Sequence, residues 1–305
     1  MKRPSLRKYS ANLLGHLPFN LLSPRLLSFR FGESDLRGWM TDGVLGQGDE
    51  ISIQQIYSII AEYVQKSGPN PIHVWAMENG HSAKIAELLR FAHRLDCPTK
   101  IVLTGENCTR ESISRLLHSG VDEIWMIFGG LSHQVHEEVT ALNIEDSVRI
   151  LHLLLEERAE SKTKICIAVP WVREAPKEMS ALRDWAMELG VDKVQVHIPY
   201  FGADIASKTI PNHPRLSAIL EKTLWERNDR QPGWKKQQPL PCPVGNRRLE
   251  IASNGRVCSC PFKTPVEWKD ESFVQLWKKL SSHRKEISHC KRMCWHPELQ
   301  YLRLS

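Results

Sequence analysis

The sequence has no apolar stretch long enough for a secretory signal peptide or a membrane span, and its first segment, MKRPSLRKYSANLLGHLPFN, is basic. We therefore expect a cytoplasmic protein that makes no membrane contact. In a reducing compartment disulfides are rare, and clustered cysteines more often bind metal. Secreted and membrane-embedded classes are excluded on this basis.

The signatures of several common functional classes are also absent. No Ser/His/Asp or zinc-hydrolase motif occurs, and the glycine-containing loops GQGDE and GENCTRE carry no lysine that could cradle a phosphate. The chain carries a net charge of +6, but no RNA- or DNA-binding signature accompanies it. Nucleic acid is therefore not the partner that we expect.

Cysteine is missing from the first 96 residues of the chain and concentrated near its end. None of the eight cysteines precedes Cys97, and three, Cys97, Cys108 and Cys166, are scattered singly. The other five lie in the last 64 residues. This distribution indicates a metal-binding unit at the C-terminal end of the sequence.

From residue 51 onward, helical and strand patterns alternate regularly. The segment ISIQQIYSIIAEYVQKSG places Ile56, Ile59, Ile60 and Val64 on one helical stripe closed by Gly68. The expected strands are 27–31, 71–77, 100–105, 122–130, 164–171 and 192–201. Alternation of this kind predicts an α/β fold with a parallel sheet, here a partial (β/α)6 TIM-like barrel.

An internal echo supports this reading. LLHSGVDEIWM (116–126) and AMELGVDKVQV (186–196) have the same form 70 residues apart, which corresponds to two βα units. Gly120 and Gly190 are the expected helix C-caps in these units. Ligands of such sheets bind at the C-terminal ends of the strands.

A boundary follows the last barrel strand. The segment QPGWKKQQPLPCP is rich in proline, glycine and glutamine, and RRLEIAS, Asn254-Gly255 and RVCSC then predict a β-hairpin followed by the helix 272–287. We expect an N-terminal extension (1–25), the barrel (26–235) and a small α+β metal-binding domain (236–305). A unit of this size benefits from a metal that stabilises it.

Four cysteines of the C-terminal unit are the candidate metal ligands. Cys242 and Cys260 flank the hairpin, Cys290 and Cys294 follow the helix, and Cys258 is an alternative ligand. A set of four thiolates suits an iron–sulfur cluster or zinc and disfavours calcium and magnesium. Buried thiols without metal are the alternative interpretation of the same residues.

The pattern C-x12-G-x4-C after a barrel, then a tryptophan-containing helix and C-x3-C, resembles the SPASM/Twitch extension of radical SAM enzymes. The resemblance covers the barrel rhythm of 27–230 and the extension of 236–305. It implies one auxiliary [4Fe–4S] cluster, because the chain has five of the seven cysteines of the full SPASM pattern, with zinc as the alternative. It also implies a protein or peptide partner.

The resemblance fails at the family's catalytic cluster. Radical SAM enzymes carry C-x3-C-x2-C after the first strand, whereas SDLRGWMT puts Ser34, Gly38 and Thr41 at those positions. The family's Gly-Gly-Glu-Pro motif is replaced by AMENG, which keeps only Glu78 and one glycine. Neither a hydroxyl nor a hydrogen replaces an iron-binding thiolate. We therefore expect no reductive cleavage of S-adenosylmethionine, and this compound is a doubtful cofactor.

Several strand-end residues are candidates for the barrel pocket. Glu78 and His197 could act as an acid/base pair, although either could equally be a hydrogen-bonded pocket or core residue. The other candidates are Trp75, Asn79, His81, Phe128, His133, Trp171 and Tyr200. Whether this protein is an enzyme stays open on these residues alone.

Charge is distributed unevenly. From Lys235 to the end, 14 Lys and Arg oppose 6 Asp and Glu, a balance of 14 − 6 = +8, which leaves −2 elsewhere. Such a basic cap attracts an acidic partner, or it is simply a solvated basic face. The favoured function is a radical SAM-like pseudoenzyme that serves as partner or substrate-binding subunit in a peptide or natural-product modification pathway. The alternatives are an iron–sulfur electron-transfer module and an enzyme with altered, non-radical chemistry.

Overall fold

A computed structural model describes residues 24–32, 50–76, 82–105, 108–158, 161–170, 178–197, 248–259 and 265–280. The fold is α/β and is organised around one sheet, whose strands follow the order β6-β5-β4-β3-β2-β1-β7-β8-β9. The strands are β1 (Leu26–Phe31), β2 (Ile72–Ala76), β3 (Thr99–Leu103), β4 (Glu123–Ile127), β5 (Lys164–Pro170), β6 (Lys193–His197), β7 (Arg248–Ala252), β8 (Arg256–Cys258) and β9 (Val266–Glu267). From β6 to β7 every neighbouring pair is parallel. The six expected barrel strands are thus confirmed.

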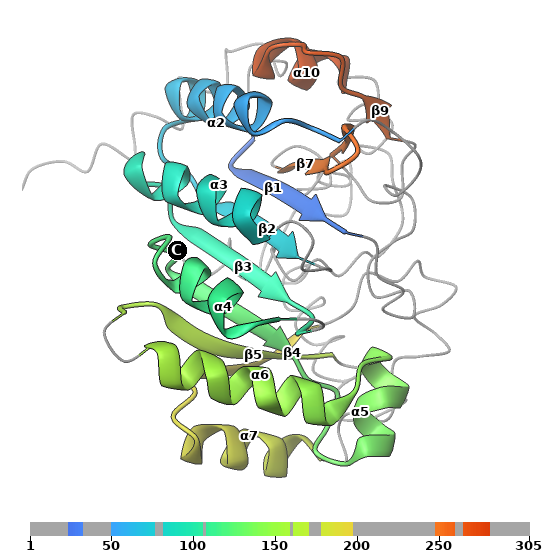
Figure 1. Ribbon diagram of the computed structural model, residues 1–305. Helices are drawn as coiled ribbons and strands as arrows, with labels where there is room; N and C mark the ends of the chain where they lie inside the picture. The colour runs from blue at the N-terminus through green and yellow to red at the C-terminus, as the bar shows by residue number, and fades with distance from the viewer. Residues whose placement is uncertain are drawn as a thin grey trace, which may run out of the picture.

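Helices cover one face of this sheet (Figure 1). They are α2 (Ile53–Ser67), α3 (Ser82–Arg94), α4 (Arg110–Leu117), α5 (His133–Thr140), α6 (Ile144–Glu157), α7 (Met179–Glu188) and α10 (Phe273–Lys279). Each described crossover between β1 and β6 passes through a helix, which is the usual connection between parallel strands. None of the helices in the described part of the chain is long and apolar enough to cross a membrane.

The first crossover helix, α2, shows why the apolar stripe predicts its position. Ser52 and Gln55 form a capping box at its start, and Gly68 ends it at φ 81°. Between these ends, Ile56, Ile59 and Ile60 are buried against the sheet. The helix predicted from 51–68 is therefore confirmed.

The two Gly-Val-Asp segments are equivalent in structure as well as in sequence. Gly120 and Gly190 have φ values of 81° and 90°. The Asp122 carboxylate accepts a hydrogen bond from Thr99 N at 2.7 Å, and Asp192 accepts one from Ile165 N at 2.8 Å. Each aspartate thus fastens the start of its own strand to the preceding one. The repeated Gly-Val-Asp segments therefore stabilise strand pairing and do not form a binding site.

The expected hairpin forms and extends the barrel sheet. β7 and β8 are antiparallel, and the turn between them includes Gly255 at φ 74°. β7 also pairs in parallel with β1, with Leu27 opposite Leu249. The helix α10 packs on α2, where the rings of Phe273 and Tyr63 lie 5.5 Å apart. The described part of 236–305 is therefore continuous with the barrel sheet, while the expected boundary near 235 lies outside the described residues.

Candidate functional site

The sheet has two chemically different faces. On the helix-facing side, β1 contributes Leu27 and Phe29, and β7 contributes Leu249 and Ile251, all fully buried. Because successive side chains of a strand alternate between faces, their neighbours lie on the opposite side. We call this second side the inner face. In the described strands its residues include Leu26, Ser28, Arg30, His73, Trp75, Lys100, Val102, Glu123, Trp125, Ile127, Lys164, Cys166, Ala168, Pro170, Lys193, Gln195, Arg248, Glu250, Ala252, Arg256, Cys258 and Glu267.

Strand register aligns the polar residues of the inner face into a row. The row runs Glu250, Ser28, His73, Lys100, Glu123 and Lys164, one residue from each of six neighbouring strands. Branched apolar side chains dominate the corresponding layers of closed α/β barrels. This row of the inner face is polar, whereas the next row of the same face contains the buried residues Trp75, Val102, Trp125 and Cys166.

Three charged residues from β1 and β7 form a buried ion cluster. Arg30 Nη2 lies 2.6 Å from Glu250 Oε1, and Arg248 Nη2 contacts the other carboxylate oxygen. Side-chain exposure is 4% for Arg30, 3% for Arg248 and 1% for Glu250. Two guanidinium groups on one carboxylate leave a local charge of +1. Burying such a group is costly unless its charges stay paired.

A second cluster surrounds Trp125 on β4. The Lys100 Nζ lies 4.0 Å from the ring centroid, and the Lys193 Nζ lies 5.2 Å from it. The indole Nε1 donates a hydrogen bond to Glu123 Oε2 at 2.7 Å, and Trp125 itself is fully buried. Both lysines are within the range of a cation–π attraction. The ring thus holds two ammonium groups on the inner face.

The single cysteines of the barrel are buried thiols. Burial, followed by the charge of Glu123, raises the pKa of Cys166 to about 12. Burial and then the charge of Asp96 raise the pKa of Cys97 to about 11. Metal binding requires the thiolate, which these environments disfavour. Within the described ranges, no three His, Cys, Asp or Glu side chains come together as metal ligands.

Most of the predicted site residues lie outside the described part of the chain. This applies to Glu78, Cys242, Cys260, Cys290 and Cys294, and also to the segment 33–49 that contains Ser34, Gly38 and Thr41. His197 is the last residue of β6, so its backbone is at the C-terminal strand end where the sequence placed it. Neither the acid/base pair nor the four-cysteine site is therefore tested by the structure, and both stay predictions.

Cys258, the alternative ligand, is the one metal candidate whose surroundings are described. It is 1% exposed, and it lies opposite Glu250 in the β7–β8 ladder, so both side chains are on the inner face. Arg30 and Arg248 both contact Glu250. The residue opposite Cys258 is thus a carboxylate that two guanidinium groups already hold, and whether Cys258 is a metal ligand stays a prediction. Cys260 lies outside the described residues, so the choice between Cys258 and Cys260 stays a prediction.

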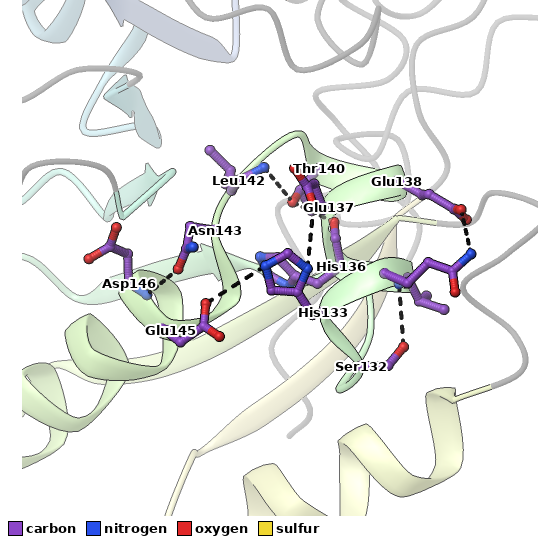
Figure 2. Close-up of polar contacts among 12 residues, drawn as sticks. Ser132, His133, His136, Glu137, Glu138, Thr140, Leu142, Asn143, Glu145 and Asp146 are labelled. Carbon is purple, nitrogen blue, oxygen red and sulfur yellow. Dashed lines mark hydrogen bonds and ion pairs between the residues drawn. The ribbon is translucent and has the colours of Figure 1, made fainter.

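Two strand-end candidates after β4 are structural. Phe128 is fully buried, with its ring 5.3 Å from His136 and 5.8 Å from Trp185. His133 is exposed and lies between the Glu137 and Glu145 carboxylates, 3.3 Å and 4.0 Å away (Figure 2). These contacts bind the loop and the two helices α5 and α6 together. They do not point a reactive group at the inner face.

His136, which the sequence did not single out, is the buried histidine of this region. Its Nδ1 accepts a hydrogen bond from Gly129 N at 3.4 Å, and its Nε2 lies 3.2 Å from Ser147 Oγ. Burial lowers the pKa of His136 to about 4, so the ring is neutral at pH 7. Ser147 Oγ donates to Asn143 O, which leaves its lone pairs for Nε2–H. The histidine is a hydrogen-bonded core residue rather than a base.

The loop that follows β4 is held by Glu178. This carboxylate accepts hydrogen bonds from Leu131 N at 2.6 Å, Ser132 N at 2.9 Å and Ser132 Oγ at 2.6 Å. Burial raises the pKa of Glu178, but the hydrogen bonds from Ser132 and Leu131 outweigh it, and the pKa lies below its ordinary value. The backbone N–H groups at the start of α5 are thus already occupied by an internal anion.

A polar groove of about 480 Å³ lies where the hairpin meets α2. Its walls come from Glu50–Gln55, Asn254–Arg256 and Glu267–Asp270. Gln55 bonds to Asp270 across it, and Glu50 pairs with Lys84. The Gln55–Asp270 contact joins the C-terminal segment to the barrel, whereas the Glu50–Lys84 pair lies within the barrel, so the groove is the junction between these two segments.

Comparison with solved structures decides the fold. SuiB of Streptococcus suis bound to its precursor peptide SuiA matches with a TM-score of 0.64 and 15% identity, over 89% of this chain and 68% of that one. The chain has the fold of radical SAM enzymes. SuiB bound to S-adenosylmethionine gives a TM-score of 0.61 at 14% identity, over 89% of this chain and 67% of that one. Tagged anSMEcpe with bound AdoMet gives 0.54 at 10% identity, over 87% and 84%.

The radical SAM likeness is one of structure and not of sequence. No protein-family model matches this sequence, and no curated protein matches it. The partial barrel expected from the strand–helix alternation is therefore confirmed by the shared fold, whereas the activity of this chain must be argued from its own residues.

Proposed function

We propose that this protein is a radical SAM-like binding subunit in a peptide modification pathway. In this role it has lost the cluster that cleaves S-adenosylmethionine and keeps one auxiliary [4Fe–4S] centre. The observation that carries the proposal is the pairing of a radical SAM fold with Ser34, Gly38 and Thr41 at the positions of the three cluster thiolates. A barrel of this fold without those ligands retains a surface for binding.

The peptide part of the proposal has structural support. SuiB was crystallised with its precursor peptide, and anSMEcpe with a peptide named Cp18Cys, the latter match having a TM-score of 0.51. In this chain, the inner face of the sheet carries charged groups where a closed barrel would be packed with apolar side chains. Such a face suits recognition of a polar chain better than burial in a core.

The described residues also favour binding over catalysis. His136 is neutral and hydrogen bonded, His133 is paired with Glu137, and the thiols of Cys97 and Cys166 are buried with raised pKa values. A general base or nucleophile needs an accessible group with a pKa near the working pH. The described residues at hand do not have this combination.

The metal centre is assigned to Cys242, Cys260, Cys290 and Cys294, with Cys258 as the alternative ligand. An iron–sulfur centre held there would supply one-electron redox chemistry and a rigid cross-link for the C-terminal unit. Cys258 is buried beside the arginine–glutamate cluster, on the inner face of the sheet. These residues thus fit a thiolate-bound metal, with zinc as the alternative metal.

Metal and turnover measurements test the proposal together. Protein purified without oxygen is analysed for iron, sulfide and zinc and incubated with S-adenosylmethionine and a reductant. We expect the iron and sulfide of one cluster in the wild type, loss of both in Cys290→Ala, and retention in the matched variant Cys97→Ala. Deoxyadenosine should not form. Two clusters per chain, or methionine and deoxyadenosine as products, would show that the catalytic centre is intact.

A further inference from the structure

Two side chains of the inner face carry buried polar atoms that have no hydrogen-bond partner in the described part of the chain. They are the indole Nε1–H of Trp75 and the hydroxyl of Ser28. Trp75 is 8% exposed, and Ser28 is fully buried. A buried polar group that makes no hydrogen bond lowers stability, and such groups are rare unless a water or a ligand pairs with them. The two groups are therefore candidates for contact with a ligand.

Strand register places the two groups close to each other. Trp75 on β2 lies opposite Arg30 on β1, and Ser28 precedes Arg30 by two residues on the same face. The two side chains thus extend from adjacent strands on the same side of the sheet. Trp75 is next to Ala76, the last residue of β2, so it lies at the C-terminal edge where parallel α/β sheets bind ligands. Ser28 lies one layer deeper.

Trp125 provides an internal comparison, because its indole is buried in the same row of the inner face. Trp75 lies opposite Val102, and Val102 lies opposite Trp125, so the two tryptophans are two strands apart. The indole Nε1 of Trp125 donates a hydrogen bond to Glu123 Oε2 at 2.7 Å. The described chain thus supplies an acceptor to one buried indole of this row and none to the other. This difference distinguishes a structural tryptophan from one that is available to a ligand.

The two groups together select an uncharged oxygen acceptor. An indole N–H only donates, whereas a hydroxyl both donates and accepts. The neighbouring guanidinium groups of Arg30 and Arg248 already contact Glu250, so they do not require an anion. A peptide main chain offers a carbonyl oxygen to the indole, and it offers either of its amide groups to the hydroxyl. The chemistry therefore fits the backbone of an extended peptide.

We propose that Trp75 and Ser28 form hydrogen bonds with the main chain of a peptide bound on the inner face, with a backbone carbonyl accepting from Trp75 Nε1. This inference rests on the proposed peptide-binding role and assigns two binding residues to it. The two side chains would then recognise the backbone of the peptide rather than one type of side chain. If buried water paired with both groups instead, adding a peptide would leave them unchanged.

Indole N–H resonances test the inference in the full-length protein. The chain has ten tryptophans, so the Trp75 signal of ¹⁵N-labelled protein is identified by its loss in Trp75→Phe. Hexaserine and hexaglutamine are titrated to millimolar concentration. We expect both peptides to move the Trp75 signal downfield to saturation and to leave the Trp125 signal in place, since that indole is already bonded to Glu123.

Ser28→Ala tests the second residue with a change that is smaller than Trp75→Phe. The affinity for hexaserine, read from the Trp75 signal, should fall about threefold to tenfold, because one uncharged hydrogen bond is lost. Ser119→Ala is the matched control. Ser119 is 1% exposed, and its Oγ donates to Leu116 O at 2.5 Å, so its hydroxyl is used within the fold. This variant should leave the affinity unchanged.

The remaining outcomes separate this inference from the proposed function. Circular dichroism shows whether each variant folds, and equal weakening by Ser28→Ala and Ser119→Ala would overturn the inference. If other signals saturate while the Trp75 signal stays in place, the peptide binds elsewhere, and the inference is wrong although a peptide-binding role remains. If no signal moves, the inference and the peptide-binding role both fail, whereas the cluster assignment is decided separately by iron and sulfide analysis.

Discussion

The same strands supply the helix-facing side and the inner face of the sheet, but the residues on the two sides differ in polarity. Ile101, Ile124 and Ile165 are fully buried between sheet and helices, while their chain neighbours Lys100 and Glu123 stand on the opposite face with Lys164. Burial of the helix-facing residues stabilises the fold by about 25 cal/mol for each Å² of apolar surface removed from water. The inner face is mixed, because Trp125 and Cys166 are also fully buried there, whereas Lys164 and Lys193 are exposed.

The largest effect should come from the buried ion cluster of the inner face. Replacing Glu250 by Leu leaves Arg30 and Arg248 without their shared carboxylate, and we expect a loss of about 3–5 kcal/mol in the free energy of unfolding. Urea denaturation measures it. The double variant Arg30→Met/Glu250→Leu should recover part of the loss. A change below about 1 kcal/mol would mean that water, and not Glu250, solvates the two arginines.

The next comparison sets adjacent residues on opposite faces against each other. Ile101→Ala removes a fully buried side chain from the helix-facing core, and we expect a loss of about 3 kcal/mol, within the usual range for such truncations. Lys100→Met keeps the side-chain stem on Trp125, and its effect should stay below about 1.5 kcal/mol. Chemical denaturation of both variants checks the difference. Equal losses would show that the two faces are packed alike.

Acid sensitivity should arise on the helix side, at His136. The pKa of this residue is about 4 in the folded state and 6.5 when unperturbed. As pH falls below 6.5, His136 binds a proton in the unfolded chain but stays neutral in the folded chain. The free energy of unfolding therefore decreases until about pH 4. The contribution is about 3 kcal/mol over this interval. His133 and Glu145 are the charged groups that act on the ring.

Replacing His136 by Gln should flatten the stability profile between pH 6.5 and about 4, although it lowers stability at neutral pH. His152→Gln is the matched control, because that side chain is exposed on α6 and is not among the groups that act on the His136 ring. Thermal unfolding across this pH range provides the measurement. An unchanged slope in His136→Gln would assign the acid sensitivity to other groups.

The sequence predicts local elements well because their causes are local. The apolar stripe of α2, the capping residues Ser52 and Gly68 and the matching turns at Gly120 and Gly190 all act within a few residues of chain. The short helix α5 was missed, since its eight residues show only an N-cap at Ser132 and little periodicity. Its signal is weaker than that of a three-turn helix.

Contacts between distant strands could not be predicted from pattern alone. Nothing in RRLEIAS indicates that β7 pairs in parallel with β1, more than 200 residues earlier, because strand pairing is not written in either segment. The polar row of the inner face could not be predicted for the same reason. Ser28 and Arg30 occur as isolated polar residues in LLSFRF, and they join Glu250 and His73 only through the register of the sheet. The candidate site was therefore sought at strand ends, and its charged inner face was missed.

The smallest expected effect on stability belongs to a residue with an expected effect on binding. The Ser28 hydroxyl is buried and makes no hydrogen bond within the described part of the chain, so Ser28→Ala should change the free energy of unfolding by no more than about 0.5 kcal/mol. Differential scanning calorimetry of the variant and of Ser119→Ala, which loses the hydrogen bond to Leu116 O, measures this. A residue that contributes to binding but not to folding shows such a separation, whereas a structural residue loses both together. If Ser28→Ala lowered stability by several kcal/mol, a buried water would hold its hydroxyl, and the inner face would be a second core.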